Sequence, residues 1–119
     1  MEKLTGLAIV GAAGGMLAIV MGLGTAAAEE TIGQQVYGTT CIACHGADGR
    51  GAFPGTPDFT DPEGALAKPD DELMHNIIDG FQSPGSFMAM PPKGGNPALS
   101  EAEVEAVIAY LRANFGQET

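Results

Sequence analysis

Two cysteines three positions apart, followed at once by a histidine, constrain this chain more than any other feature. The segment reads Cys41-Ile42-Ala43-Cys44-His45, and a Cys-x-x-Cys-His run is the attachment pattern for a covalent c-type haem. On one helical turn the two thiols face the same side, so both can reach the two vinyl groups along one porphyrin edge. The imidazole then projects toward the iron, for which it is a strong ligand. The motif predicts that the rest of the chain closes a pocket around one haem c.

Other interpretations of the two cysteines remain open at this point. A disulfide between Cys41 and Cys44, or a thioredoxin-like redox pair, leaves the adjoining histidine as a coincidence, and no βαβ pattern surrounds the motif. A zinc site needs a second pair of ligands, and the sequence offers no further cysteine and one further histidine, His75. We expect His75 to be a solvated surface residue, because it lies off the apolar stripe of its predicted helix.

The chain begins with an apolar segment that addresses it to a membrane. Residues 4–28 carry no charged side chain, and the small residues that end this run favour a signal peptide over residues 1–28, removed after Ala28. The apolar run is also long enough to span a bilayer, so a retained anchor formed by residues 4–24 is the alternative. In both cases we expect residues 29–119 to form one extracytoplasmic, periplasmic domain with one haem.

The formal net charge of the chain is −10. Nucleic acid is excluded as a natural partner, because phosphate binding requires a basic surface. The acidity serves either solubility or an acidic docking face, and the second interpretation predicts a redox partner protein with a basic docking patch. Contact with a membrane is expected only through the possible N-terminal anchor.

Apolar periodicity predicts three helices, over residues 30–45, 70–79 and 100–115. Asp70 is the expected N-cap of the second helix, and Gly80 is expected to end it. The apolar stripe of the first helix consists of Ile32, Val36 and Tyr37. Because the remaining segments are irregular, the pattern predicts an all-α fold.

A glycine inside the first predicted helix indicates where two helices meet. Glycine costs about 1 kcal/mol of helix propensity relative to alanine, so Gly33 is either tolerated or required by the close approach of another helix. Gly33 shares a face with Tyr37, and Tyr110 of the last helix is the natural partner for that face. We expect the first and last helices to cross there. The last helix opens with a capping box formed by Ser100 and Glu103.

Residues 46–69 are dense in glycine and proline, which prevents long regular structure. They are predicted to form a loop that wraps a large flat cofactor, with Phe53 and Phe59 as packing contacts. One backbone carbonyl of this loop should accept the proton on the second ring nitrogen of the motif histidine and so orient it. We expect the carbonyl of Pro57 in this role, with Pro54 as the alternative.

The rigid apolar segment 80–97 holds two methionines that are candidates for a second iron ligand. A thioether is a soft ligand suited to iron, although methionine also serves to fill gaps in a core. Pro91 biases Met90 toward an extended backbone and stiffens the next residues of the segment, so Met90 is the predicted ligand and Met88 the alternative. Met74 lies on the stripe of a predicted helix and is expected in the core.

With these residues placed, the chain resembles the class I monohaem c-type cytochromes of bacteria over residues 31–115. It is most similar to short cytochromes whose ligand segment reads Met-Pro-Pro-Lys-Gly. Gly33 and Tyr37 match the glycine and the aromatic residue that precede the first cysteine by eight and four positions. Val107 and Tyr110 match the apolar and aromatic pair of the last helix. The resemblance implies three to four helices and irregular loops wrapped around one covalent haem, with the N- and C-terminal helices crossing.

The resemblance also implies a function. With His45 and Met90 as the two axial iron ligands, the protein is expected to be a one-electron carrier, and not an enzyme, in an extracytoplasmic respiratory or photosynthetic electron-transfer chain. Two alternatives are a membrane-anchored haem subunit of an oxidoreductase complex and a haem enzyme with a labile sixth ligand.

Overall fold

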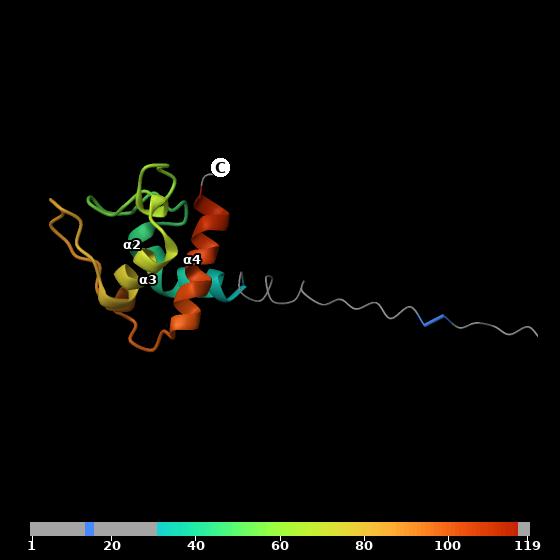
Figure 1. The fold of residues 1–119 in the computed structure, drawn as a ribbon. Coiled ribbons are helices and arrows are strands. Elements are labelled where there is room, and N and C mark those ends of the chain that lie inside the picture. Colours follow the sequence, from blue (N-terminus) through green and yellow to red (C-terminus); the bar gives the residue numbers. More distant parts are fainter. Residues whose placement is uncertain (1–13, 16–30, 117–119) are drawn as a thin grey trace, which may run out of the picture.

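Three helical stretches build the part of the chain that the structure, a computed structural model, describes, namely residues 14–15 and 31–116 (Figure 1). The first covers residues 31–45 and ends with α2 (Ile42–His45), the second is α3 (Asp70–Asp79) and the third is α4 (Glu101–Phe115). Over these ranges there is no strand, only an isolated antiparallel bridge between Phe81 and Met90. The predicted all-α fold is confirmed.

The first and last helices cross where the glycine of the first was expected to allow it. A Cβ atom on Gly33 would lie 2.3 Å from the carbonyl oxygen of Ala106 and 2.7 Å from Cβ of Tyr110, so only glycine permits this approach. The ring of Tyr37 packs beside the same crossing, with its centroid 5.4 Å from that of Tyr110 and 5.5 Å from that of Phe115. The predicted crossing is therefore confirmed.

The first helical stretch departs from a regular α-helix at its middle. Its segment η1 (Tyr37–Cys41) is a single π-helical turn, in which the N–H of Ile42 donates to the carbonyl of Tyr37 five residues earlier. Such a turn holds one residue more than an α-helical turn and occurs often at functional sites. The apolar stripe predicted for a regular helix is correct for Val36, which is buried, but wrong for Ile32, which is 41% exposed.

Local signals define α3 and α4. Gly80 ends α3 with a φ of 85°, and Ser100 caps α4 through the reciprocal capping box with Glu103, as expected. The expected N-cap of α3 is wrong: Pro69 occupies that position, and Asp70 is the first helical residue. Its carboxylate instead accepts a hydrogen bond from Nε of Arg112 at 2.7 Å, which draws the side chain toward α4.

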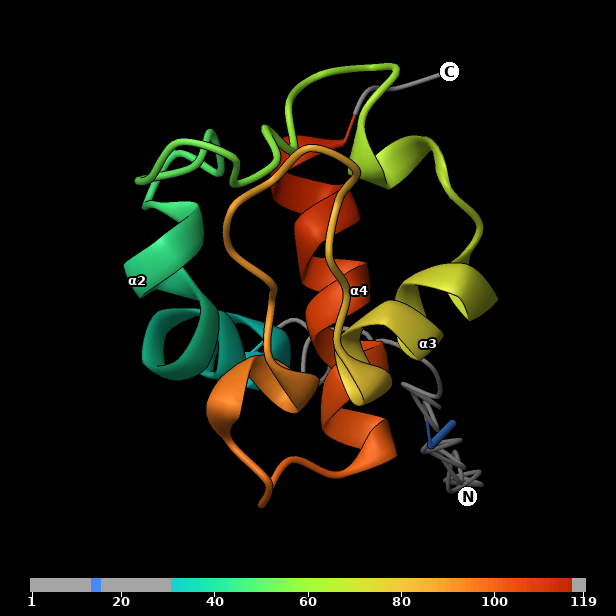
Figure 2. The same ribbon diagram turned by 90° about the vertical axis from the view of Figure 1, so that its left-hand side faces the viewer.

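Two irregular segments complete the described domain. Residues 46–69 contain one short 3-10 turn, η2 (Ala65–Ala67), and residues 80–100 contain another, η3 (Pro92–Gly95). Figure 2 shows α4 between α2 and α3, with the segment around residues 80–90 running in front of it. The side chains of α4 that face inward are buried and supply much of the core: Val104, Ala106, Val107, Ile108 and Leu111.

Among the residues that the structure describes, no helix has both the length and the apolar character needed to cross a bilayer. The predicted signal peptide or anchor over residues 1–28 lies outside the described residues, apart from positions 14 and 15.

Candidate functional site

A cavity of about 640 Å³ opens between α2, α3, α4 and the segment around residues 80–90. Its volume falls within the range of about 300–1,000 Å³ that is usual for cofactor and ligand sites. Most of the wall is apolar, with Leu73, Ile77, Val107 and Leu111 supplied by α3 and α4. All six site residues predicted from the sequence line this cavity: Cys41, Cys44, His45, Pro57, Phe59 and Met90.

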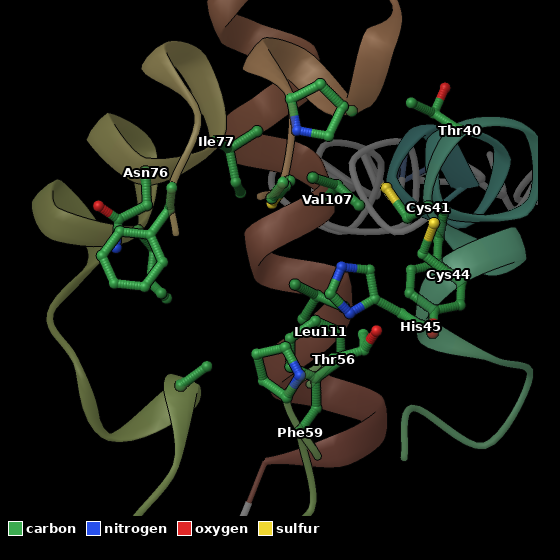
Figure 3. A pocket seen from close by; sticks show the side chains of 18 of the residues that line it. Thr40, Cys41, Cys44, His45, Thr56, Phe59, Asn76, Ile77, Val107 and Leu111 are labelled. Carbon is green, nitrogen blue, oxygen red and sulfur yellow. The ribbon is translucent and has the colours of Figure 1, made fainter. Parts of the chain in front are cut away.

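Both cysteines of the motif lie along one side of the cavity (Figure 3). Cys41 is partly exposed and Cys44 is exposed, and they are not joined in a disulfide. Burial raises the pKa of the Cys41 thiol to about 11, and the neighbouring Cys44 adds to the shift. Two free thiols therefore face one edge of an apolar cavity.

The backbone after the motif is fixed by hydrogen bonds to the loop that follows. The carbonyls of Cys44 and His45 each accept a hydrogen bond at 2.8 Å, from the N–H groups of Ala52 and Gly51. The hydroxyl of Tyr37 donates to the carbonyl of Gly46. Burial, as the main cause, raises the pKa of Tyr37 to about 12, so the phenol keeps the proton that it donates at neutral pH. These hydrogen bonds fix the backbone of His45 and its two neighbours, and so limit the positions that the imidazole can take.

His45 is the one polar residue in the buried core of the described domain, at 8% exposure. Its ring stacks on Phe59 with the centroids 4.6 Å apart and the planes 17° from parallel. Burial lowers its pKa, which favours the neutral imidazole that a metal ion requires. Phe59 thus packs where it was expected, whereas Phe53, the other expected contact, is 49% exposed and does not line the cavity.

The hydrogen bond predicted between His45 and the carbonyl of Pro57 is not formed. Nδ1 of His45 is buried and has no hydrogen-bond partner among the described residues. The ring of His45 stacks on Phe59, and neither Pro57 nor the alternative Pro54, although both line the cavity, places its carbonyl within hydrogen-bond reach of Nδ1. A buried nitrogen without a partner is costly, so the imidazole is suited to a ligand that fills the cavity.

The two candidate methionines both line the cavity but are held differently. The N–H of Met90 donates to the carbonyl of Phe81 at 2.7 Å, and the N–H of Phe81 donates back at 3.1 Å. Met88 is 44% exposed near the tip of the same segment. Met74 packs against the core from the other face of α3 and does not line the cavity.

His75 lies away from the cavity, as predicted. Its side chain is 72% exposed, and Nδ1 lies 2.8 Å from a carboxylate oxygen of Asp79 one turn later on α3. Within the described ranges no group of three or more His, Cys, Asp or Glu side chains lies close enough together to hold a metal ion.

Sequence reasoning missed several polar residues of the cavity wall, among them Lys68 and Asn76. Asn76 had a detectable signal, because it lies three positions after Leu73 and one before Ile77, on the inward face of its helix. Lys68 had none, since its place on the wall depends on a loop conformation that no local pattern predicts.

The donor set fits haem c. Two free thiols at one edge of an apolar cavity can each form a thioether with a vinyl group. A buried neutral imidazole and a thioether sulfur on the same wall are the ligands found for iron in cytochromes c.

Comparison with known proteins gives concordant matches. A family model described as cytochrome c oxidase, cbb3-type, subunit III matches residues 28–111. The Cbb3-type cytochrome c oxidase subunit CcoP of Rhodobacter capsulatus is 31% identical over 90 residues, which cover 75% of this chain and 30% of that subunit. Cytochrome c-555 of Chlorobaculum thiosulfatiphilum is 34% identical over 83 residues, covering 70% of this chain and 93% of the relative. Cytochrome c-554(548) of Halomonas halodenitrificans is 33% identical over 85 residues, covering 71% and 89%. The chain thus spans about 30% of the CcoP subunit but most of the small cytochromes.

Proposed function

This chain belongs to the cytochrome c family and carries one covalently bound haem c, and from this premise we propose that it is a one-electron carrier whose iron is held by His45 and Met90. Its place is an extracytoplasmic respiratory or photosynthetic electron-transfer chain. When bound, the haem supplies a single redox change between ferric and ferrous iron. The residues of this chain attach the haem and hold its iron ligands in position.

Cys41 and Cys44 hold the cofactor. Each thiol adds across one vinyl group, the sulfur to one carbon and the hydrogen to the other, so the attachment needs no oxidant. Both thiols lie on one side of the cavity, which is the arrangement that two vinyl groups on one porphyrin edge require. The exposed position of Cys44 leaves this edge accessible.

His45 is the first iron ligand in this proposal. It is buried, its pKa is lowered, and its ring is held between Phe59 and a backbone whose carbonyls are already hydrogen-bonded. The imidazole therefore needs little reorganisation when the iron changes oxidation state, which favours rapid electron transfer.

The observation that carries the second ligand is the backbone bridge between Phe81 and Met90. Two hydrogen bonds fix the backbone of Met90 on one side, and Pro91 follows it with an extended φ/ψ of −69° and 157° on the other. A ligand held in this way loses little conformational entropy on binding. The backbone of Met88 is held only locally, since its N–H donates to Oγ of Ser86 at 3.3 Å and its carbonyl accepts from the same hydroxyl at 2.9 Å. Its exposed side chain makes Met88 the weaker candidate.

Paired variants of the two methionines test the ligand assignment. Met90→Ala should abolish the sulfur-to-iron charge-transfer band at the red edge of the ferric spectrum and lower the reduction potential, because a thioether favours ferrous iron. Met88→Ala, which removes a side chain from the same segment, should leave the band in place and serves as the control. The native ferric protein should also be low-spin and slow to bind cyanide. Loss of the band in Met88→Ala alone would transfer the role to Met88, and rapid cyanide binding by the native protein would contradict the carrier function.

A second candidate is a haem subunit of a membrane oxidoreductase, favoured by the match to the CcoP subunit. It requires that the N-terminal segment be retained as an anchor. Purification of the protein from detergent-solubilised membranes separates the two functions: co-purification with other redox subunits supports the complex, and recovery from the periplasmic fraction without residues 1–28 supports the free carrier.

The net charge of −10 supports a partner with a basic docking patch. Opposite charges raise the association rate, and salt screens this effect. The rate of electron transfer to the physiological partner should therefore fall as ionic strength rises. A rate that does not change with salt would leave the acidity as a solubility feature.

A further inference from the structure

The cavity has a polar edge on the side that faces the two cysteines from across it. Figure 3 shows Asn76 on the opposite side of the cavity from Cys41 and Cys44, and Figure 2 shows α2 and α3 on either side of α4. The wall on the α3 side is formed by residues of the segment 65–81: Ala65, Leu66, Lys68, Leu73, Asn76, Ile77 and Phe81. Lys68 and Asn76 are its two hydrogen-bond donors.

Lys68 brings a positive charge to this edge. Its Nζ lies 4.3 Å from the ring centroid of Phe81 and 3.2 Å from a carboxylate oxygen of Glu72. The backbone beneath it is fixed, because Arg112 donates to the carbonyls of Leu66 and Lys68 at 2.8 Å and 2.7 Å. In the described part of the chain no Asp or Glu side chain lines the cavity. Although the protein is acidic overall, the charged side chain on this wall is therefore the cation of Lys68 and not a carboxylate.

Asn76 brings a neutral donor to the same edge. It is partly buried on the inward face of α3, between Leu73 and Ile77, where an apolar residue would be expected. Its amide forms no hydrogen bond with another residue that the structure describes. Because this amide faces the cavity and forms no such bond, it is available to donate to a polar group of a bound ligand.

The structure of haem indicates which of its polar groups lies beside Lys68 and Asn76. Its two vinyl groups lie on adjacent pyrrole rings, and its two propionate groups lie on the other two, at the opposite edge. Thioether bonds at Cys41 and Cys44 thus direct the two carboxylates away from α2, toward the segment 65–81. We infer that Lys68 and Asn76 form the carboxylate site that receives the haem propionates; this inference rests on the haem attachment in the proposed function.

Lys93 provides a matched control on the other side of the cavity. It also lines the cavity, but it belongs to η3, which packs on the motif helix: a Cβ on Gly94 would lie 2.9 Å from Cγ2 of Thr40, and the amide of Asn96 donates to the hydroxyl of Thr40 at 3.4 Å. Lys93→Gln therefore removes one positive charge, as Lys68→Gln does, but at the edge of the cavity near the cysteines.

The test follows the ionisation of the propionates in the haem-loaded protein. The reduction potential is measured against pH for wild type, Lys68→Gln, Asn76→Leu and Lys93→Gln, together with the NMR resonances of the propionate groups. Removing a cation beside a carboxylate raises the pKa of that carboxyl, here by about one unit. We expect this shift in Lys68→Gln, a smaller shift in the same direction in Asn76→Leu, and none in Lys93→Gln. The other charged groups around this edge, namely Glu72 and the Arg112–Asp70 and His75–Asp79 pairs, are the same in all four proteins.

The outcomes separate this inference from the proposed function. If the Met90 band and the haem content are intact in every variant and the pH titration of Lys68→Gln and Asn76→Leu equals that of wild type, the carboxylate site is wrong and the carrier function stands. An equal shift in Lys93→Gln would also overturn it, since a general change of charge would then explain the result. A wild-type protein without covalent haem would refute the proposed function itself.

Discussion

Replacing Gly33 by alanine tests whether the helix crossing sets the stability of the domain. The added methyl group would lie 2.3 Å from the carbonyl oxygen of Ala106 and 2.7 Å from Cβ of Tyr110, well inside the optimum of about 3.5–4.0 Å for a dispersion contact. Both obstacles belong to the framework of α4, so no change of side-chain rotamer relieves the clash. The two helices must separate by about 1 Å at the centre of the fold, where packing leaves little free space.

Two opposing effects decide the magnitude. Alanine gains about 1 kcal/mol of helix propensity over glycine, and overpacking of a core costs about 1–3 kcal/mol. Because the obstacles here are rigid, we expect the upper end of that cost and a net loss of about 2 kcal/mol. For a domain of this size, that loss lowers the melting temperature by about 10 °C.

The assay is guanidinium unfolding of the haem-loaded protein, followed by far-UV circular dichroism. Gly38→Ala is the matched control, because it lies in the same helical stretch, has no atom within 4 Å of the added methyl group, and should be neutral or stabilising by up to about 1 kcal/mol. The importance of the Gly33 crossing for stability is contradicted if Gly33→Ala unfolds at or above the wild-type midpoint with an unchanged slope, or if Gly38→Ala loses as much stability as Gly33→Ala.

Three further predictions concern hydrogen bonds within the domain. Tyr37→Phe keeps the ring packing but leaves the carbonyl of Gly46 without its donor, so equilibrium unfolding should show a loss of about 1 kcal/mol. Arg112→Leu removes the donor to two loop carbonyls and should cost about 2 kcal/mol, whereas Asp70→Asn, which alters only an exposed ion pair of the same guanidinium, should cost less than about 1 kcal/mol; equal losses would contradict the importance of the carbonyl contacts. Hydrogen bonds from the hydroxyl and N–H of Thr60 lower the pKa of Asp58, so wild type should be more stable than Asp58→Asn above the ordinary aspartate pKa of about 3.9, and this advantage should disappear as pH falls through the lowered value; an advantage that persists in acid would contradict the assignment.

Local signals explain which parts of the fold were predictable. The C-terminal end of α3 and the cap of α4 follow from Gly80, Ser100 and Glu103, whose effects reach only a few residues along the chain. The crossing at Gly33 was predictable because glycine destabilises a helix, which suggests that close packing requires it at this position. The π-turn and the exposure of Ile32 were not predictable, since both depend on the tertiary packing of the first helix, which its local sequence does not specify.

The residues of the candidate site that belong to short sequence motifs were predictable. The motif cysteines, His45, Phe59 and Met90 reach the cavity as expected. The stacking of His45 on Phe59 was not predictable, because the two residues are fourteen positions apart and no local pattern pairs them. The role of Arg112 depends on contacts with carbonyls more than forty positions away along the chain, for which the sequence carries no pattern.

The π-turn at Tyr37–Cys41 makes the length of this stretch as important as its composition. Upstream of the turn, Gly33 fixes the helix against α4, and downstream of it the motif fixes the cavity wall. Within the turn, Gly38 and Thr39 are exposed, and the hydroxyl of Thr39 donates to the carbonyl of Gln35 at 2.8 Å. Removing one residue from the turn would restore ordinary α-helical spacing, whereas adding one more residue would rotate the motif relative to Gly33 by about 100°. The exposed Gly38 can therefore be substituted without changing this geometry, but the insertion of one further residue between Gly33 and the motif would turn the cysteines and His45 away from the cavity.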